Sequence, residues 1–288
     1  MIRCSPETVR FVCSGLDHPE GLCFGPDGTL FAGGEAGQVY RVDEESGVSE
    51  VIAKTGGFVL GLCADASGTI YLCDAGRNQV LRVGANGRVE PVSSGPLNNP
   101  NDCVLDPDGN LFFTESGIYS PERHSGRLHA ISAEGEARCI HPGPFRFANG
   151  VFFDRVSSQL YVVESTRPGV LVFRTDGPAL ASAEPVRRID LEPDTIPDGV
   201  ALDAAGNLYV AFYSPDQIGV VRPDGSFEVL IRDFLAEWMN RPTNIALRRN
   251  EIVFANLGGW HIGKIRQQLD PIRPCYPETG PRPTRGTP

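Results

Sequence analysis

The stretch that decides the fold is Pro197-Asp198-Gly199-Val200-Ala201-Leu202-Asp203-Ala204-Ala205-Gly206-Asn207-Leu208-Tyr209-Val210, because the chain uses this pattern six times. A polar residue is followed by a short apolar run, a turn that contains Gly, and a second apolar run. Short apolar runs bounded by turn residues are typical of β-strands. Aligning the six copies brings these residues to one equivalent position: Glu20, Leu60, Asn101, Asn149, Asp198 and Asn244.

These six positions are separated by 40, 41, 48, 49 and 46 residues. A repeat period in this range, with several strands in each repeat, is typical of a β-propeller. A second predicted hairpin brings most repeats to four strands. The sequence therefore predicts an all-β fold, a six-bladed β-propeller with four-stranded antiparallel blades around a central channel. A predicted strand at residues 8–13 joins the last blade and closes the ring.

The rest of the chain indicates one domain and a tail. We expect residues 1–270 to form the propeller and residues 271–288 to form a proline-rich tail that is poorly ordered beyond Tyr276. The N-terminus has no long apolar stretch, so we expect no signal peptide and no membrane span. The net charge of −10 disfavours nucleic acid as a partner. Eight cysteines without a Cys-x-x-Cys pair favour a cytoplasmic protein with reduced thiols. Nothing in the sequence indicates an oligomeric state.

The blade geometry predicts where a functional site lies. The first strand of each propeller blade lines the central channel, and the repeated position opens that strand. We therefore expect its side chains to converge on the axis at one face, and we call it the ring position. Loops after the second strands surround it, and the one with an insertion, residues 116–126, is a candidate lid or specificity loop. Rim residues that we expect to contact substrate are Glu115, Tyr119, His124, Glu164, Tyr213 and Trp260.

Four ring residues suit a metal ion. Glu20, Asn101, Asn149 and Asp198 would offer two carboxylates and two amide oxygens from four different blades. Two carboxylates this close repel each other unless a cation lies between them. Hard oxygen ligands favour one divalent cation, with Ca²⁺ expected first and Mg²⁺, Mn²⁺ or Zn²⁺ as alternatives. No His or Cys joins the ring, which argues against a structural zinc site.

The phrases Pro-Glu-Gly, Pro-Asn-Asp, Ala-Asn-Gly and Pro-Asp-Gly, each opening a blade, resemble the gluconolactonase / senescence-marker / luciferin-regenerating-enzyme family and the related diisopropyl fluorophosphatase. The resemblance implies that Glu20, Asn149 and Asp198 bind a divalent metal. It also implies that Asn101 binds the metal or the substrate, and that Asp198 is the general base or nucleophile. Animal gluconolactonases carry Arg two positions before the equivalent of Asn101. Asn99, a further expected substrate contact, stands there in this chain and argues against an aldonolactone of the animal kind.

Three functions fit this ring. We expect a metal-dependent hydrolase, a gluconolactonase-like lactonase that opens a sugar lactone or another small lactone with activated water and uses Asp198 as the catalytic residue. Hydrolysis of a phosphotriester or aryl ester by the same site is the second hypothesis. A non-catalytic propeller, pinned by calcium and binding a ligand or protein, is the third. A fold alone does not distinguish these functions.

Overall fold

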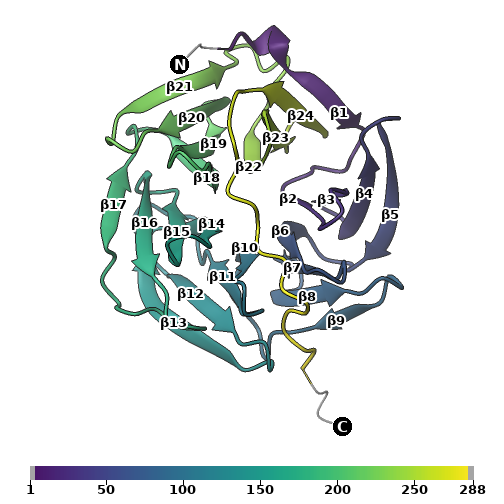
Figure 1. Cartoon of the computed structure of the whole chain (residues 1–288), viewed down its shortest axis with the longest axis vertical. Helices are drawn as coiled ribbons and strands as arrows, with labels where there is room; N and C mark the ends of the chain where they lie inside the picture. The colour runs from purple at the N-terminus through teal and green to yellow at the C-terminus, as the bar shows by residue number, and fades with distance from the viewer. Residues whose placement is uncertain (1–3, 285–288) are drawn as a thin grey trace.

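The computed structural model of the protein describes residues 4–284, and it confirms the predicted fold. Six four-stranded antiparallel sheets surround a central axis as the blades of a propeller (Figure 1). The helical structure in the described residues is limited to a single 3-10 turn, η1 (Pro6–Thr8). Within residues 4–284, no helix is long and apolar enough to span a membrane.

Consecutive strands build the first three blades. The first blade contains β2 (Leu22–Phe24), β3 (Leu30–Gly33), β4 (Gln38–Asp43) and β5 (Val48–Lys54). The second contains β6 (Val59–Ala64), β7 (Ile70–Asp74), β8 (Gln79–Val83) and β9 (Val89–Pro91). The third contains β10 (Pro100–Leu105), β11 (Leu111–Glu115), β12 (Gly126–Ile131) and β13 (Ala137–Phe145).

The last blade combines both ends of the chain. The fourth blade contains β14 (Ala148–Asp154), β15 (Gln159–Glu164), β16 (Gly169–Arg174) and β17 (Arg187–Asp190). The fifth contains β18 (Ile196–Leu202), β19 (Leu208–Ser214), β20 (Gln217–Val221) and β21 (Phe227–Arg232). The sixth contains β22 (Pro242–Arg248), β23 (Glu251–Asn256), β24 (His261–Arg266) and β1 (Arg10–Ser14).

The hydrophobic core is divided among the six blade interfaces. Each of the six buried apolar clusters draws its side chains from two neighbouring blades. Val253 and Ala255 of the sixth blade, for example, pack with Leu22 and Phe24 of the first. A single blade therefore cannot bury its own apolar faces, which explains why the repeat must close into a ring.

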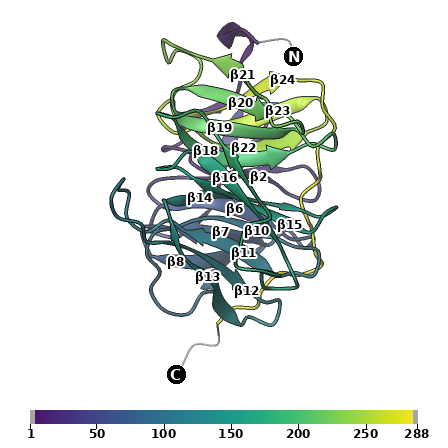
Figure 2. The same cartoon turned by 90° about the vertical axis from the view of Figure 1, so that its left-hand side faces the viewer.

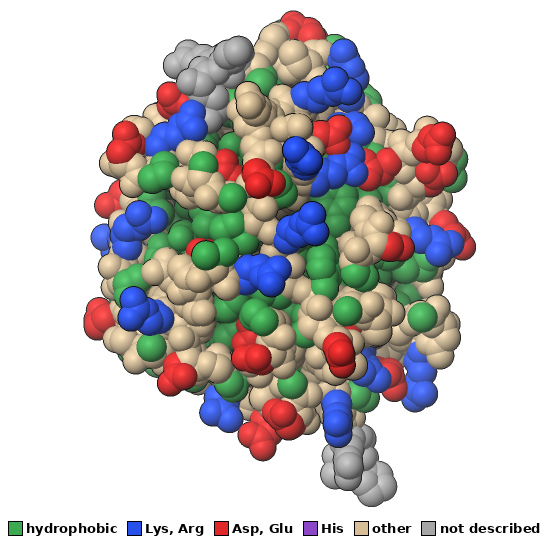
Figure 3. All heavy atoms as spheres, in the orientation of Figure 1, with side chains coloured by type: hydrophobic (Ala, Val, Ile, Leu, Met, Phe, Trp, Pro, Cys, Tyr) green, Lys and Arg blue, Asp and Glu red, His purple; other side chains and the backbone are tan. Residues whose placement is uncertain are grey.

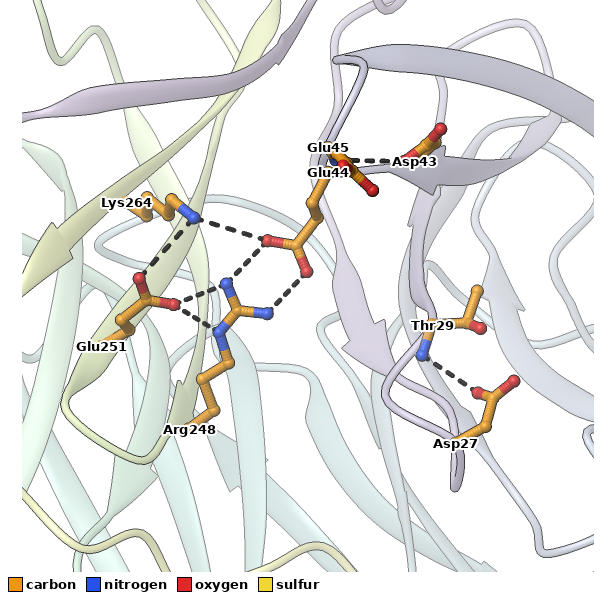
Figure 4. A network of polar contacts seen from close by, with 8 residues as sticks. All are labelled: Asp27, Thr29, Asp43, Glu44, Glu45, Arg248, Glu251 and Lys264. Carbon is orange, nitrogen blue, oxygen red and sulfur yellow. Dashed lines mark hydrogen bonds and ion pairs between the residues drawn. The ribbon is translucent and has the colours of Figure 1, made fainter.

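Two further interactions stabilise the junction between the last and first blades: a strand pairing and a network of ion pairs. Strand β1 pairs with β24, as the sequence predicted, although it begins at Arg10 rather than residue 8. At the same junction the Arg248 guanidinium binds both carboxylate oxygens of Glu44, at 2.6 and 2.7 Å (Figure 4). Glu251 and Lys264 complete the network. A bidentate pair fixes orientation as well as supplying energy, so it holds the first blade against the sixth.

In four blades the turn at the far end of the inner strand follows the predicted Gly-containing pattern. Gly109 and Gly206 have φ of 86° and 80°, values that favour glycine. The preceding aspartates cap these turns, since Asp106 Oδ1 accepts the amides of Asp108 and Asn110 at 2.9 Å. We call this end of the channel the turn face.

The C-terminal tail crosses the turn face and forms hydrogen bonds to the blades. Figure 1 looks onto this face, and Figure 2 shows the tail running along one side of the propeller. Beyond Tyr276, Ala66 donates its amide hydrogen bond to Pro277 O at 2.8 Å and Thr284 donates to Pro91 O at 3.0 Å. The sequence did not predict these contacts, because proline-rich composition does not reveal which backbone groups a neighbouring surface can satisfy. Poor order beyond Tyr276 stays a prediction. The division at residues 270 and 271 stays a prediction.

Acidic and basic side chains are interspersed on this face, as Figure 3 shows. The net charge of −10 is therefore not gathered there into a field of a single sign.

Candidate metal centre and cleft

The ring position coincides with a break in strand pairing. In five blades, the pairing of the innermost strand with its neighbour shifts across this position, between Val59 and Leu62, Pro100 and Cys103, Ala148 and Val151, Pro197 and Val200, and Pro242 and Ile245. A β-bulge leaves a residue unpaired and re-aims its side chain. The irregularity therefore frees the ring side chains from the sheets and lets them face the axis.

Glycine after the ring position brings neighbouring inner strands close together. A Cβ placed on Gly21 would lie 2.1 Å from the carbonyl oxygen of Leu60, and one on Gly150 would lie 2.4 Å from that of Asp198. Both positions thus require glycine for close backbone approach. The result is a narrow channel end in which side chains from different blades can share one centre.

A cleft of about 410 Å³ opens at this end of the channel. The four predicted metal ligands line it together: Glu20, Asn101, Asn149 and Asp198. Leu60 lines the same cleft, as its place in the repeat predicted. The sixth ring residue, Asn244, lines a smaller cavity below, and its Oδ1 accepts the amide of Ile245 at 2.8 Å. The ring is therefore asymmetric, with polar ligands from four of the six blades.

Glu20 and Asp198 are buried carboxylates. Among residues 4–284, neither carboxylate forms an ion pair with a basic side chain. Burial raises the pKa of Asp198 to about 7, against the opposing effect of a contact with the Asn149 amide. Burial, followed by repulsion from Asp198 and Asp102, raises the pKa of Glu20 well above its usual range. Both shifts have the direction expected of carboxylates that await a positive charge.

Asn149 supplies a buried oxygen with no partner. Its Nδ2 donates to Ser165 Oγ at 3.0 Å, and Ser165 in turn donates to Pro197 O at 2.7 Å. These bonds fix the amide and leave Oδ1 buried and unpaired. An orphaned amide oxygen beside two uncompensated carboxylates is the donor set of a hard divalent cation, so the residues fit the metal that the sequence predicted.

Asp102 is a third buried carboxylate that the sequence analysis missed. It stands where four other repeats have glycine, and its oxygens accept the amides of Cys103 at 2.9 Å and Val151 at 2.8 Å. Burial and the nearby Cys103 raise the pKa of Asp102 to about 8. Because its two oxygens already bind amides of two blades, we assign it a positioning role beneath the ring. The signal in the sequence was an acidic residue in a glycine column.

Three of the expected substrate contacts reach the cleft. Asn99, Tyr119 and Tyr213 all line it. Tyr119 comes from the long loop of the third blade, residues 116–126, and packs edge to face on Phe147 with ring centroids 5.0 Å apart. The loop therefore reaches over the site from one side.

The other four expected contacts lie elsewhere. Glu115 contacts His129 at 2.5 Å, and Glu164 binds Arg188 at 2.6 Å, so both carboxylates are engaged within their own blades. His124 does not line the cleft. Trp260 is half exposed and packs against His18 with centroids 4.6 Å apart. None of the four enters our proposal for substrate binding.

Several cleft residues escaped the sequence analysis. Phe58, Phe147 and Ile196 line the cleft, each two residues before a ring position. Alternate residues of an extended strand share one face, so the column that precedes the ring forms a second layer above it. The aligned repeats contained this signal, but apolar residues beside a strand resemble ordinary core. Three further residues complete the lining: Ala75, Thr243 and Leu257.

A second group of potential metal ligands lies outside the cleft. Oxygen or nitrogen atoms of Asp17, His18 and Glu35 lie within 4.8 Å of one another. His18 Nδ1 is 2.7 Å from Glu35 and 3.0 Å from Asp17, so these groups satisfy one another. We assign no metal to them.

Thiols line the channel below the ring. A cavity of about 90 Å³ there contacts Cys23, Cys63 and Cys103, and residues 274–276 of the tail close it from the turn face. The Cys63 and Cys103 sulfurs are 3.8 Å apart. All eight cysteines lie in the described residues, and all are free thiols.

The chain is similar in sequence to known hydrolases. Pentonolactonase XacC of Haloferax volcanii is 27% identical over 182 residues, which cover 62% of this chain and 60% of that enzyme. Diisopropyl-fluorophosphatase of Loligo vulgaris is 26% identical over 217 residues, covering 67% and 68%. The match thus spans less than two thirds of the Haloferax enzyme's own length.

Structural comparison supports the fold. Regucalcin of Agrobacterium tumefaciens, described as a calcium-binding protein, matches with a TM-score of 0.72 at 16% identity, covering 92% of this chain and 97% of that one. A likeness at this identity shows the fold alone. Residues 34–252, most of the chain, match the family described as SMP-30/Gluconolactonase/LRE-like region. The chain belongs to the SMP-30/gluconolactonase/LRE-like family.

Proposed function

We propose that this protein is a divalent-metal-dependent hydrolase that opens a lactone ring. One observation carries the proposal: two buried, uncompensated carboxylates and two amide side chains meet at the base of an open cleft. A purely structural metal site would need no such opening. The pentonolactonase relative supports a cyclic ester as the substrate class.

Four side chains would hold the cation: Glu20, Asn101, Asn149 and Asp198. All offer oxygen, and together they supply a charge of about −2, which suits Ca²⁺. When bound, such an ion polarises a carbonyl and lowers the pKa of water. Regucalcin, which shares the fold, is described as binding calcium, in line with this assignment.

Asp198 is the group we assign to proton transfer. Burial raises its pKa to about 7 in the absence of metal, which supports a carboxylate that can take up a proton near neutral pH. One oxygen of Asp198 would face the ring, and the other would take the proton of the attacking water. Glu20 would act through charge and ligation. Asn149, fixed by Ser165, would orient its oxygen without exchanging a proton.

A second candidate function is hydrolysis of a phosphotriester or aryl ester at the same centre. The similarity to diisopropyl-fluorophosphatase, which extends over 217 residues, favours it. A phosphoryl oxygen and a carbonyl oxygen can both be polarised by the same metal ion. The two candidate functions therefore differ in substrate and would use the same residues.

A substrate panel tests the proposal. Purified protein is stripped with a chelator, then assayed on small lactones, aryl esters and a phosphotriester, before and after calcium is restored. We expect lactone hydrolysis that disappears on chelation and returns with calcium. Calcium-dependent phosphotriester or ester cleavage without lactone cleavage would select the second candidate. Calcium binding with no hydrolysis of any member would indicate a binding propeller.

A further inference from the structure

We propose that the substrate of this site carries an apolar substituent, an aryl or alkyl group on its lactone ring, and is not a polyhydroxylated sugar lactone. The inference rests on the proposed function, because it names the substrate class for the same cleft. It is drawn from the layer of side chains that stands between the ring and solvent.

The second layer of the cleft is mainly apolar. Four residues that stand two positions before the ring line the cleft, each from a different blade. Phe58, Phe147 and Ile196 are apolar, and the fourth is Asn99. Leu60 extends this surface down into the ring itself, and Leu257 adds to it from the sixth blade. A substrate whose carbonyl reaches the metal ligands must therefore rest its remaining atoms on hydrocarbon.

Few polar groups are available to recognise hydroxyls. Among the described residues that line the cleft there is no Lys, Arg or His. The Thr243 hydroxyl already donates to Glu20 O at 2.7 Å. Above the ring, Asn99 and the two tyrosine hydroxyls are the other polar side-chain groups. On binding, the hydroxyl groups of a sugar lactone would lose several hydrogen bonds to water and gain few to the protein. Burying hydroxyl groups without hydrogen-bond partners costs free energy, so such a lactone would bind weakly.

Aromatic rings give the wall a definite shape. Tyr119 meets Phe147 at an interplanar angle of 84°, and the Arg241 guanidinium lies 5.2 Å from the Tyr213 ring. Aromatic pairs in such edge-to-face contact bury area with little loss of side-chain freedom. A volume of about 410 Å³ accommodates a small molecule with one ring substituent.

Phe147 and Trp260 offer a matched pair of variants. Phe147 lines the cleft with φ of 62°, a backbone conformation that Asn tolerates well, so Phe147→Asn removes the ring without adding strain. Trp260 also has a positive φ, 55°, and is a half-exposed aromatic outside the cleft. Trp260→Asn is therefore the control for loss of an aromatic from a left-handed position.

The test compares kcat/KM of the calcium-loaded protein on δ-phenyl-δ-valerolactone and glucono-δ-lactone. Burial of a phenyl group predicts a preference of about tenfold or more for the phenyl lactone. Phe147→Asn should reduce that preference about tenfold, whereas Trp260→Asn should leave it unchanged. Equal or better turnover of the gluconolactone, or a preference that both variants alter alike, would overturn the inference.

Binding of non-hydrolysable analogues separates this inference from the proposed function. If neither lactone is hydrolysed, the proposed function fails, and calorimetry with the corresponding phenyl-substituted δ-lactam and gluconolactam decides the inference. Tighter binding of the phenyl lactam, weakened by Phe147→Asn and not by Trp260→Asn, supports an apolar-substituted ligand. Equal affinities, or tighter binding of the gluconolactam, contradict it.

Discussion

Two buried aspartates flank the length of strand β18: Asp198 lies near its start and Asp203 follows its last residue. Their surroundings are different. Asp203 lies at the turn face, where its carboxylate accepts the amides of Ala205 and Asn207, at 3.0 and 2.9 Å. The Asn207 side chain and the Tyr209 hydroxyl also donate to it. Asp198 lies in the cleft without an ion-pair partner, and its pKa is raised to about 7.

The difference teaches which aspartates of a repeat are structural. At the turn face, Asp106 and Asp203 each accept hydrogen bonds from the backbone amides two and four residues later. The turn therefore satisfies the charge of these two carboxylates. At the ring, the bulged strands expose side chains whose charge nothing in the described protein satisfies. Burial without satisfaction is the mark of a site that a ligand completes.

The largest expected effect is on catalysis. Asp198→Asn keeps an oxygen for the metal but cannot accept a proton at neutral pH. With saturating calcium, we expect kcat to fall by roughly 10²–10⁴-fold, the usual contribution of a general base. Steady-state kinetics at several calcium concentrations checks this. If added calcium restores the activity, Asp198 is only a ligand.

Glu20→Gln removes the same charge from the ring but should act through the metal. We expect calcium affinity to fall by about 10–100-fold, with kcat largely recovered at high calcium. Titration of activity against free calcium gives both quantities. A variant that stays slow at saturating calcium would place Glu20 in the chemical step and weaken the distinction from Asp198.

Proton competition predicts a pH dependence of calcium binding. Because the pKa of Asp198 is raised to about 7, a proton must leave this carboxylate when calcium binds below that pH. Affinity should rise by at least about tenfold per pH unit from pH 5 to pH 7, because the pKa of Glu20, a second proposed ligand, is raised as well. In the absence of metal the sign reverses for stability: a raised carboxyl pKa stabilises the fold at low pH, and this contribution is lost as pH rises through 7. Thermal melts with and without calcium should diverge accordingly, and parallel curves would contradict the raised pKa.

The smallest effect on activity is expected at the turn face. Asp203→Ala leaves the amides of Ala205 and Asn207 without their acceptor, which should cost about 1–3 kcal/mol of stability and lower Tm by a few degrees. The kcat/KM of the folded protein and its calcium affinity should be unchanged. Lost calcium binding at temperatures where the variant is folded would show that the two ends of β18 are not independent.

The repeat made the fold and the four ring residues predictable. Alignment of the six copies gives Glu20, Asn101, Asn149 and Asp198 equivalent positions in four blades. Equivalent positions face the same central axis, even though the blades differ in the rest of their sequence. The rim was harder to predict, because the partner of a rim residue can lie on another strand, well separated from it in sequence. Glu164 looked free until Arg188, on the outermost strand of its blade, was seen to bind it. Phe58 and Phe147 resembled core residues, because the sequence alone does not show whether an apolar side chain lines a cleft or is packed in the interior.

Calorimetric titration of the chelator-stripped protein with calcium tests the central claim most directly. The ring predicts one calcium ion per chain, a higher Tm on binding, and loss of both effects in a Glu20→Ala, Asp198→Ala double variant whose Asp17, His18 and Glu35 are intact. Absence of binding heat together with an unchanged Tm, or calcium binding that survives in the double variant, would contradict a metal centre in the ring.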